Sequence, residues 1–200
     1  LFDICHMGEF RITGPDCAAA LDKVFVRSTA DQKVGVCRYN FLLTDQGTVI
    51  DDLIVYRIAP NGYRVVVNAS TRDKDLAWIE KQAQGFNLAI NVRDDLAMIA
   101  IQGPEARDHT IPLLPDEIQS RTRELGVFYA AVSDDWFIGR TGYTGEDGFE
   151  VMLPNEIAPA FWNRLIDSGV TPCGLGCRDT LRLEAGMNLY GNDMDEAISP

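Results

Sequence analysis

The chain has 200 residues, of which 46% are hydrophobic and 24% charged, and its 30 acidic and 18 basic side chains give a net charge of −12. This length fits one large domain or two small ones, and the composition is that of a globular protein able to bury a core. The acidic balance argues against nucleic acid and anionic membrane surfaces as partners, and no apolar run approaches the ~20 residues that span a bilayer.

The ends and the cysteines carry further information. The chain opens at Leu1 with neither a Met nor a signal-peptide pattern and stops at Pro200 after a polar cluster, so we expect a fragment of a longer protein. The five cysteines are irregularly spaced, which predicts free thiols in a reducing compartment. With only two histidines in the chain, we expect no metal site.

Hydrophobic alternation and turn residues divide the first half of the chain into strands and helices. A helix is expected after the Gly-Pro-Asp turn at 14–16. A second should open at Ser70, which with Asp73 resembles a capping box, and end near Gly85. Strands are expected at residues 8–13, 39–43, 48–58, 63–67 and 88–92.

The second half repeats this mixture after a short charged joint, Arg93-Asp94-Asp95. We therefore predict two domains, residues 1–92 and 93–200. Strands are expected at 96–101, 128–132, 136–140 and 149–153, and helices after 103–105, around 161–165 and over 174–185. Hairpins with only a few helices predict an α+β fold class, with two lobes of mainly antiparallel sheet and packed helices.

Two adjacent carboxylates, Asp51 and Asp52, interrupt an apolar strand. Successive strand residues face opposite sides, so one of them could share the buried face with Val49 and Leu53. A carboxylate there is costly unless it is hydrogen-bonded or used in catalysis. Alternatively, both lie close to the turn at Gly47 and are solvated, and periodicity alone does not separate these interpretations.

A second unusual segment, residues 140–150, carries three glycines in seven residues and ends at Glu150. Its glycines would let the backbone turn tightly and approach a ligand, and Tyr143 and Glu150 flank the turn. The spacing is neither a P-loop nor a dinucleotide fingerprint. Glu150 alternates with Phe149 and Val151, so it would face away from the core, although the pattern alone favours a hairpin with solvated acids.

A third segment, residues 177–184, places Arg178 and Arg182 one helical turn apart. Asp179 can pair with Arg182 at i,i+3. Arg178 could instead face an anionic or carbonyl-bearing ligand, which its planar fork would suit.

Several segments in the right order resemble the aminomethyltransferase (T-protein) family of the glycine cleavage system. They are FDICHMG at 2–8, GTVIDDLIVY at 47–56, VVNA and RDKDL at 66–69 and 72–76, TGYTGEDGFE at 141–150 and GLGCRDTLRLEAGMNLY at 174–190. Cys5 stands where Ser is usual and Cys177 where Ala is usual, so neither thiol is expected to be needed. Members of this family continue beyond the position that matches Pro200 into a third, β-rich domain.

The resemblance implies an activity and partners. Such enzymes transfer a one-carbon unit from the aminomethyl-lipoyl arm of the H-protein to tetrahydrofolate and release ammonia. It implies tetrahydrofolate as co-substrate, a lipoyl group carried by the partner, and a cytoplasmic or mitochondrial-matrix location, the cytoplasm being preferred. A folate-dependent demethylase and a non-enzymatic folate-binding module of the same fold stay as alternatives.

The resemblance also implies site residues. Asp51, the first of the paired aspartates, takes the catalytic role near the folate nitrogens, and Asp52 is expected to pack structurally. Glu150 is expected to recognise the pterin, whose adjacent N–H donors suit a carboxylate. The other expected cofactor-binding residues are Met7, Tyr39, Asn68, Tyr143 and Arg178.

Overall fold

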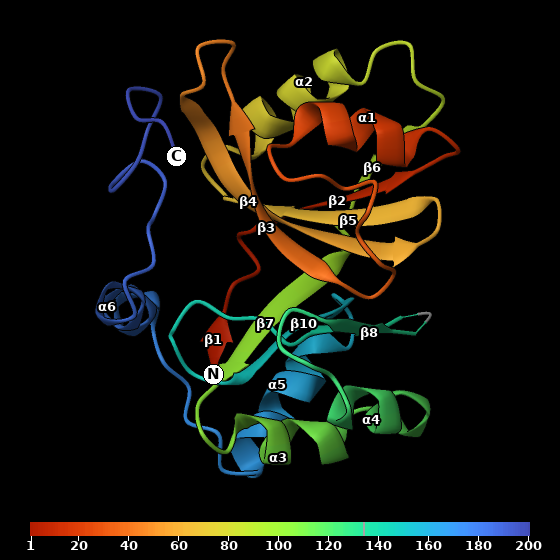
Figure 1. Cartoon of the computed structure of the whole chain (residues 1–200). Coiled ribbons are helices and arrows are strands. Elements are labelled where there is room, and N and C mark those ends of the chain that lie inside the picture. Colours follow the sequence, from red (N-terminus) through yellow and green to blue (C-terminus); the bar gives the residue numbers. More distant parts are fainter. Residues whose placement is uncertain (134) are drawn as a thin grey trace. The chain divides into compact units, whose positions relative to one another are not determined.

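The chain forms two compact units, each with its own antiparallel five-stranded sheet (Figure 1). The computed structural model describes residues 1–133 and 135–200. We call residues 7–94 with 188–200 the carboxylate-pair unit, because it holds Asp51 and Asp52. Residues 1–6 with 95–187 form the glycine-loop unit, which holds the segment 140–150. The α+β class expected from the sequence is confirmed.

The two units do not follow the linear division into residues 1–92 and 93–200, because each unit is built from two separate segments of the chain. The internal boundary lies at Asp94/Asp95, close to the predicted joint, but the first six residues and the last thirteen each join the opposite unit. Strand pairing explains the first exchange, because Phe2 is the partner of Ala100. Backbone and side-chain hydrogen bonds explain the second, since the Val49 N–H donates to the Ile198 carbonyl over 2.9 Å and Lys74 donates to Tyr190.

The carboxylate-pair unit has the strand order β3-β4-β5-β2-β6, with two helices on one face (Figure 1). Its elements are β2 (Gly8–Thr13), α1 (Cys17–Val24), β3 (Cys37–Leu43), β4 (Val49–Ala59), β5 (Gly62–Val67), α2 (Arg72–Gln82) and β6 (Ala89–Val92). Alternate strand residues such as Leu53, Val55 and Val65 meet Leu21 of α1 and Ile79 of α2 in the core.

The register of β4 decides where its two carboxylates point. Asp51 is opposite Leu42, a core residue of β3, and alternates with Leu53 and Val55, so its side chain enters the face covered by the helices. Asp52 therefore projects from the other face of the sheet, opposite Phe41. The interpretation in which both carboxylates are solvated is wrong, because Asp51 is 0% exposed.

The glycine-loop unit has the strand order β1-β7-β10-β9-β8. Its elements are β1 (Phe2–Asp3), β7 (Leu96–Gln102), α3 (Ala106–Thr110), the 3-10 turn η1 (Ile111–Leu113), α4 (Asp116–Arg123), β8 (Ala130–Val132), β9 (Phe137–Gly139), β10 (Gly148–Pro154), α5 (Ala158–Asp167) and α6 (Leu175–Glu184). Phe149, Val151 and Leu153 of β10 pack with Phe161 and Leu165 of α5 in its core. Glu150 thus lies on the opposite side of β10 from this core, as its position in the strand predicts.

Three elements are absent from the sequence prediction, namely β1, η1 and α4. Helix α4 has the sequence DEIQSRTR, in which only Ile118 and Thr122 are buried, so it lacks a sustained apolar stripe. The predicted capping box is also wrong. Helix α2 begins after Thr71 rather than Ser70, with no side-chain cap hydrogen bond.

Candidate active site

Asp51 accepts hydrogen bonds from its neighbour Asp52 and from two residues of the connection between β5 and α2. Its Oδ1 accepts hydrogen bonds from Asn68 Nδ2 and from the Asp52 backbone N–H, both at 2.9 Å. Its Oδ2 accepts a short hydrogen bond from the Thr71 hydroxyl. These three donors satisfy the hydrogen-bonding capacity of the Asp51 carboxylate. They offset the free-energy cost of burying its charge in the core.

Asp52 is half-buried and has its own partners on the other face of the sheet. The Tyr39 hydroxyl donates to Asp52 Oδ2 over 2.9 Å, and Asn68 Nδ2 donates to Asp52 Oδ1 over 2.9 Å. Burial raises the pKa of Asp52; the charge of Asp51 acts in the same direction, whereas the Tyr39 and Asn68 hydrogen bonds oppose the rise. Asn68 therefore joins the two carboxylates through a single amide nitrogen.

A third buried carboxyl group, Asp75, lies beside this pair and was not predicted as a site residue. It is 0% exposed and lies in the first turn of α2, four residues after Thr71, which precedes the helix. Burial first, and the neighbouring Asp51 second, raise the pKa of Asp75 to about 9, against the opposing effects of Lys74 and Thr71. Asp75 is thus a neutral acid at neutral pH.

The raised pKa of Asp75 makes folding stability depend on pH. The native state keeps this proton up to about pH 9, whereas the unfolded state loses it near 3.8, so stability should fall as pH rises between these values. We expect Asp75→Asn to raise the free energy of unfolding near pH 8, by up to about 6 kcal/mol, and to flatten the pH dependence. Urea unfolding near pH 5 and near pH 8 tests this. Asp73→Asn, at an exposed position of the same helix, is the control and should change neither value.

The short hydrogen bond from Thr71 gives a separate stability prediction. Thr71→Val keeps the side-chain volume but leaves Asp51 Oδ2 without this donor, so we expect a loss of about 1.5–3 kcal/mol in the free energy of unfolding. Thr180→Val is the matched control, because the Thr180 hydroxyl is exposed and only donates to the Gly176 carbonyl of its own helix. Equal losses in the two variants would contradict the assigned role of Thr71.

The second group of site residues surrounds Glu150, which is 7% exposed. Glu150 Oε2 accepts a hydrogen bond from the Thr141 hydroxyl over 2.7 Å, and Oε1 lies 3.5 Å from Arg178 Nη2. The Arg178 guanidinium carbon lies 5.1 Å from the centre of the Tyr143 ring. The interpretation of Glu150 as a solvated hairpin acid is therefore wrong, since it is buried between a hydroxyl and a guanidinium.

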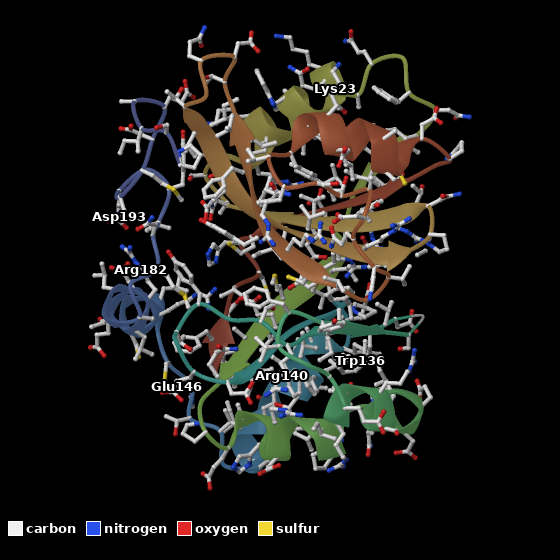
Figure 2. All side chains as sticks on the ribbon, viewed as in Figure 1. Lys23, Trp136, Arg140, Glu146, Arg182 and Asp193 are labelled. Atoms are coloured by element: carbon white, nitrogen blue, oxygen red, sulfur yellow. The ribbon has the colours of Figure 1, made fainter. Side chains whose placement is uncertain are left out.

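An ion pair joins the two ends of the loop that carries Tyr143. Arg140 Nε and Nη2 donate to the two carboxylate oxygens of Asp147 over 2.9 and 2.8 Å. Gly145 has a φ of 77°, in the left-handed region, and a Cβ on it would lie 2.9 Å from the Ala185 side chain. Arg140 and Glu146 are labelled in Figure 2, where the loop runs through the glycine-loop unit.

The two arginines of α6 have different partners. Arg182 Nε donates to Asp179 Oδ1 over 2.8 Å, which confirms the predicted i,i+3 pair. Arg178 instead approaches Glu150. Of the two, Arg178 is therefore the one placed beside a predicted site residue.

The predicted site residues fall into two groups, one in each unit. Tyr39, Asp51 and Asn68 are hydrogen-bonded together with Asp52 in the carboxylate-pair unit, and Tyr143, Glu150 and Arg178 adjoin one another in the glycine-loop unit. Met7 is half-buried and directly precedes β2. Two cavities of about 280 and 400 Å³ lie in the glycine-loop unit, and neither is lined by the second group.

Within residues 1–133 and 135–200, no three His, Cys, Asp or Glu side chains are grouped so that they could hold a metal ion. Within the same ranges no helix has the length and apolar character needed to cross a membrane.

The family model described as the GCVT N-terminal domain matches residues 1–200. The chain belongs to this family. The resemblance drawn from the sequence motifs is thereby confirmed.

Named relatives agree with this family membership. The chain is 52% identical over 206 residues to the aminomethyltransferase of Stenotrophomonas maltophilia (strain R551-3), covering 100% of the chain and 56% of that protein. It is 52% identical over 201 residues to the aminomethyltransferase of Chromobacterium violaceum, covering 100% of the chain and 55% of that protein.

A solved structure extends the comparison to the fold. The glycine cleavage system aminomethyltransferase T from Bartonella henselae superposes with a TM-score of 0.93 at 38% identity, covering 100% of this chain and 54% of that one. The chain therefore spans about half the length of the relatives that it matches.

Proposed function

We propose that the chain is the folate-handling part of an aminomethyltransferase of the glycine cleavage system. The observation that carries the proposal is 52% identity, along the whole chain, to proteins named aminomethyltransferase. The partners are tetrahydrofolate and the lipoylated H-protein, whose lipoyl arm brings the aminomethyl group. The named relatives come from bacteria, which supports a cytoplasmic location.

The transfer balances without an external oxidant or reductant. The methylene carbon loses its bonds to the lipoyl sulfur and the amino nitrogen and gains bonds to N5 and N10 of tetrahydrofolate. The protons of N5 and N10 leave with the sulfur, as a thiol, and with the nitrogen, as ammonia. Positive charge develops on the carbon as ammonia departs, so a nearby carboxylate would lower the barrier by electrostatic stabilisation.

We propose a different division of roles between the paired aspartates from the one that the resemblance implies. The resemblance gives the catalytic role to Asp51, but that side chain is 0% exposed. Asp52 is half-buried and projects from the opposite face of the sheet. We therefore assign the catalytic carboxylate to Asp52. Asp51 becomes a positioning residue that acts through Asn68, which donates to both.

Glu150 and Arg178 are proposed to recognise the pterin and the anionic tail of tetrahydrofolate. Each Glu150 oxygen has one protein partner and a second lone pair, so the carboxylate can still accept the two adjacent N–H groups of a pterin. The 200 residues carry a net charge of −12 and offer a polyanionic tail no long-range attraction, so we propose that Arg178 supplies positive charge locally.

Comparing donors tests this function against the demethylase alternative. Full-length protein is supplied with tetrahydrofolate and either aminomethylated H-protein or a small N-methylated amine. Ammonia release with H-protein alone supports the proposal, whereas methyl transfer from the small amine would favour a demethylase. Tetrahydrofolate binding without turnover of either donor would favour a folate-binding module.

A further inference from the structure

Gln102, the last residue of β7, inserts its side chain into the glycine-rich segment 140–150. Its Nε2 donates to the Thr141 carbonyl over 3.0 Å and also contacts the carbonyls of Ile101 and Phe149, at 3.2 and 3.4 Å. Its Oε1 accepts a hydrogen bond from the Thr144 hydroxyl over 3.1 Å. One amide thus holds both sides of the loop that leads into β10.

The Gln102 side chain explains why residue 142 is a glycine, whereas the neighbouring backbone already excludes a Cβ at Gly148. A Cβ on Gly142 would lie 1.8 Å from Gln102 Oε1. A Cβ on Gly148 would lie 2.1 Å from the Ile101 carbonyl oxygen and 2.9 Å from Gln102 Nε2. Gly142 has no positive φ, so the space taken by Gln102, and not backbone conformation, is what excludes a larger residue there.

The hydrogen bonds continue from Gln102 to the proposed pterin carboxylate. Thr141, whose carbonyl accepts from Gln102, donates its own hydroxyl to Glu150 Oε2 over 2.7 Å. Thr141 and Glu150 are 8% and 7% exposed, so water is largely excluded from this hydrogen bond. A shift of the Gln102 amide would therefore move Thr141 and leave Glu150 less well oriented.

We propose that Gln102, through Thr141, is a positioning residue that orients Glu150 to accept the paired N–H donors of a pterin. The inference rests on the proposed function, because it takes tetrahydrofolate as the ligand. It adds a residue that lies far from the glycine-rich segment in the sequence and contacts it only in the fold. It also gives Gly142 a defined role, which is to leave room for the Gln102 side chain.

A double-mutant cycle in the full-length protein tests the proposal. Gln102→Ala removes the amide, and Gly142→Ala pushes it from its partners, so each should raise the Kd for tetrahydrofolate about tenfold. The two changes remove the same interaction, so the double variant should bind no more weakly than either single variant. Each should raise KM for tetrahydrofolate while leaving kcat nearly unchanged. Gly176→Ala is the control, because a Cβ there meets nothing within 4 Å.

A second pair of variants tests the hydrogen-bond chain even if the Gln102 variants fold poorly. Thr141→Ser keeps the hydroxyl and should retain wild-type affinity, whereas Thr141→Val should raise the Kd about tenfold. Affinity is read by calorimetry and the melting temperature is recorded on the same samples. Melting temperatures that fall while the Kd stays at the wild-type value would overturn the proposal, as would additive effects of Gln102→Ala and Gly142→Ala. Absence of tetrahydrofolate binding by the wild-type protein would instead reject the proposed function.

Discussion

Replacing Asp52 by Asn is expected to lower kcat for aminomethyl transfer about 100- to 1,000-fold, with little change in tetrahydrofolate affinity. The variant keeps the shape of the side chain. It removes the negative charge that would stabilise the positive charge on the methylene carbon as ammonia departs. Stability should change little, because burial already raises the pKa of Asp52 and thus disfavours its charged form. The same raised pKa predicts that turnover is lost, as pH falls, at a higher pH than an ordinary aspartate would give.

Asp51→Asn is the informative companion to that variant. It leaves the Thr71 hydroxyl and the Asn68 amide facing a neutral side chain that can donate as well as accept, so its main effect should be on folding. Kinetics are compared at equal folded fraction, determined by circular dichroism. If folded Asp51→Asn is inactive while Asp52→Asn turns over normally, the catalytic carboxylate belongs to Asp51, as the family resemblance of the motifs implies.

Replacing Glu150 by Gln is expected to raise the Kd for tetrahydrofolate about 10- to 100-fold, the cost of losing charge-assisted hydrogen bonds in a buried site. The amide has one acceptor oxygen instead of two, and its NH₂ group would face the N–H donors of the pterin. The kcat at saturating tetrahydrofolate should fall much less than the affinity. Calorimetry gives the Kd, and steady-state kinetics separate KM from kcat.

Glu146→Gln is the matched control, since Glu146 belongs to the same loop but is exposed. It removes the same charge from the same segment, so any general electrostatic effect on an anionic ligand appears in both variants. Equal changes in Kd for the two variants would show that Glu150 has no specific contact with the pterin.

The fold was largely predictable where the hydrophobic pattern was regular. The strand at 8–13 was predicted with the bounds that β2 has, because its apolar residues face one covered side of a sheet. Helix α4 was missed because its packing depends on two buried residues in an otherwise polar octet. The exchange of the terminal segments between the units depends on pairings such as Phe2 with Ala100, which no local pattern encodes.

The candidate site was predictable as a set of residues but not as a network. Strand alternation put Asp51 on the face of Val49 and Leu53, yet it did not say that this face is the one covered by helices, because apolar residues such as Leu53 and Ile54 lie on both faces of β4. Asp75 and Gln102 were missed for a different reason. Each acts on a residue distant in sequence, and the effect is visible only once the helix or strand has packed.

The central claim is most directly tested by a single-turnover measurement on the full-length protein. Aminomethylated H-protein is mixed with enzyme and tetrahydrofolate, and ammonia and 5,10-methylenetetrahydrofolate are quantified together. The proposed function predicts equal amounts of the two products, both dependent on tetrahydrofolate. Ammonia release that is the same with and without tetrahydrofolate, or tetrahydrofolate binding with no ammonia formed, would contradict it.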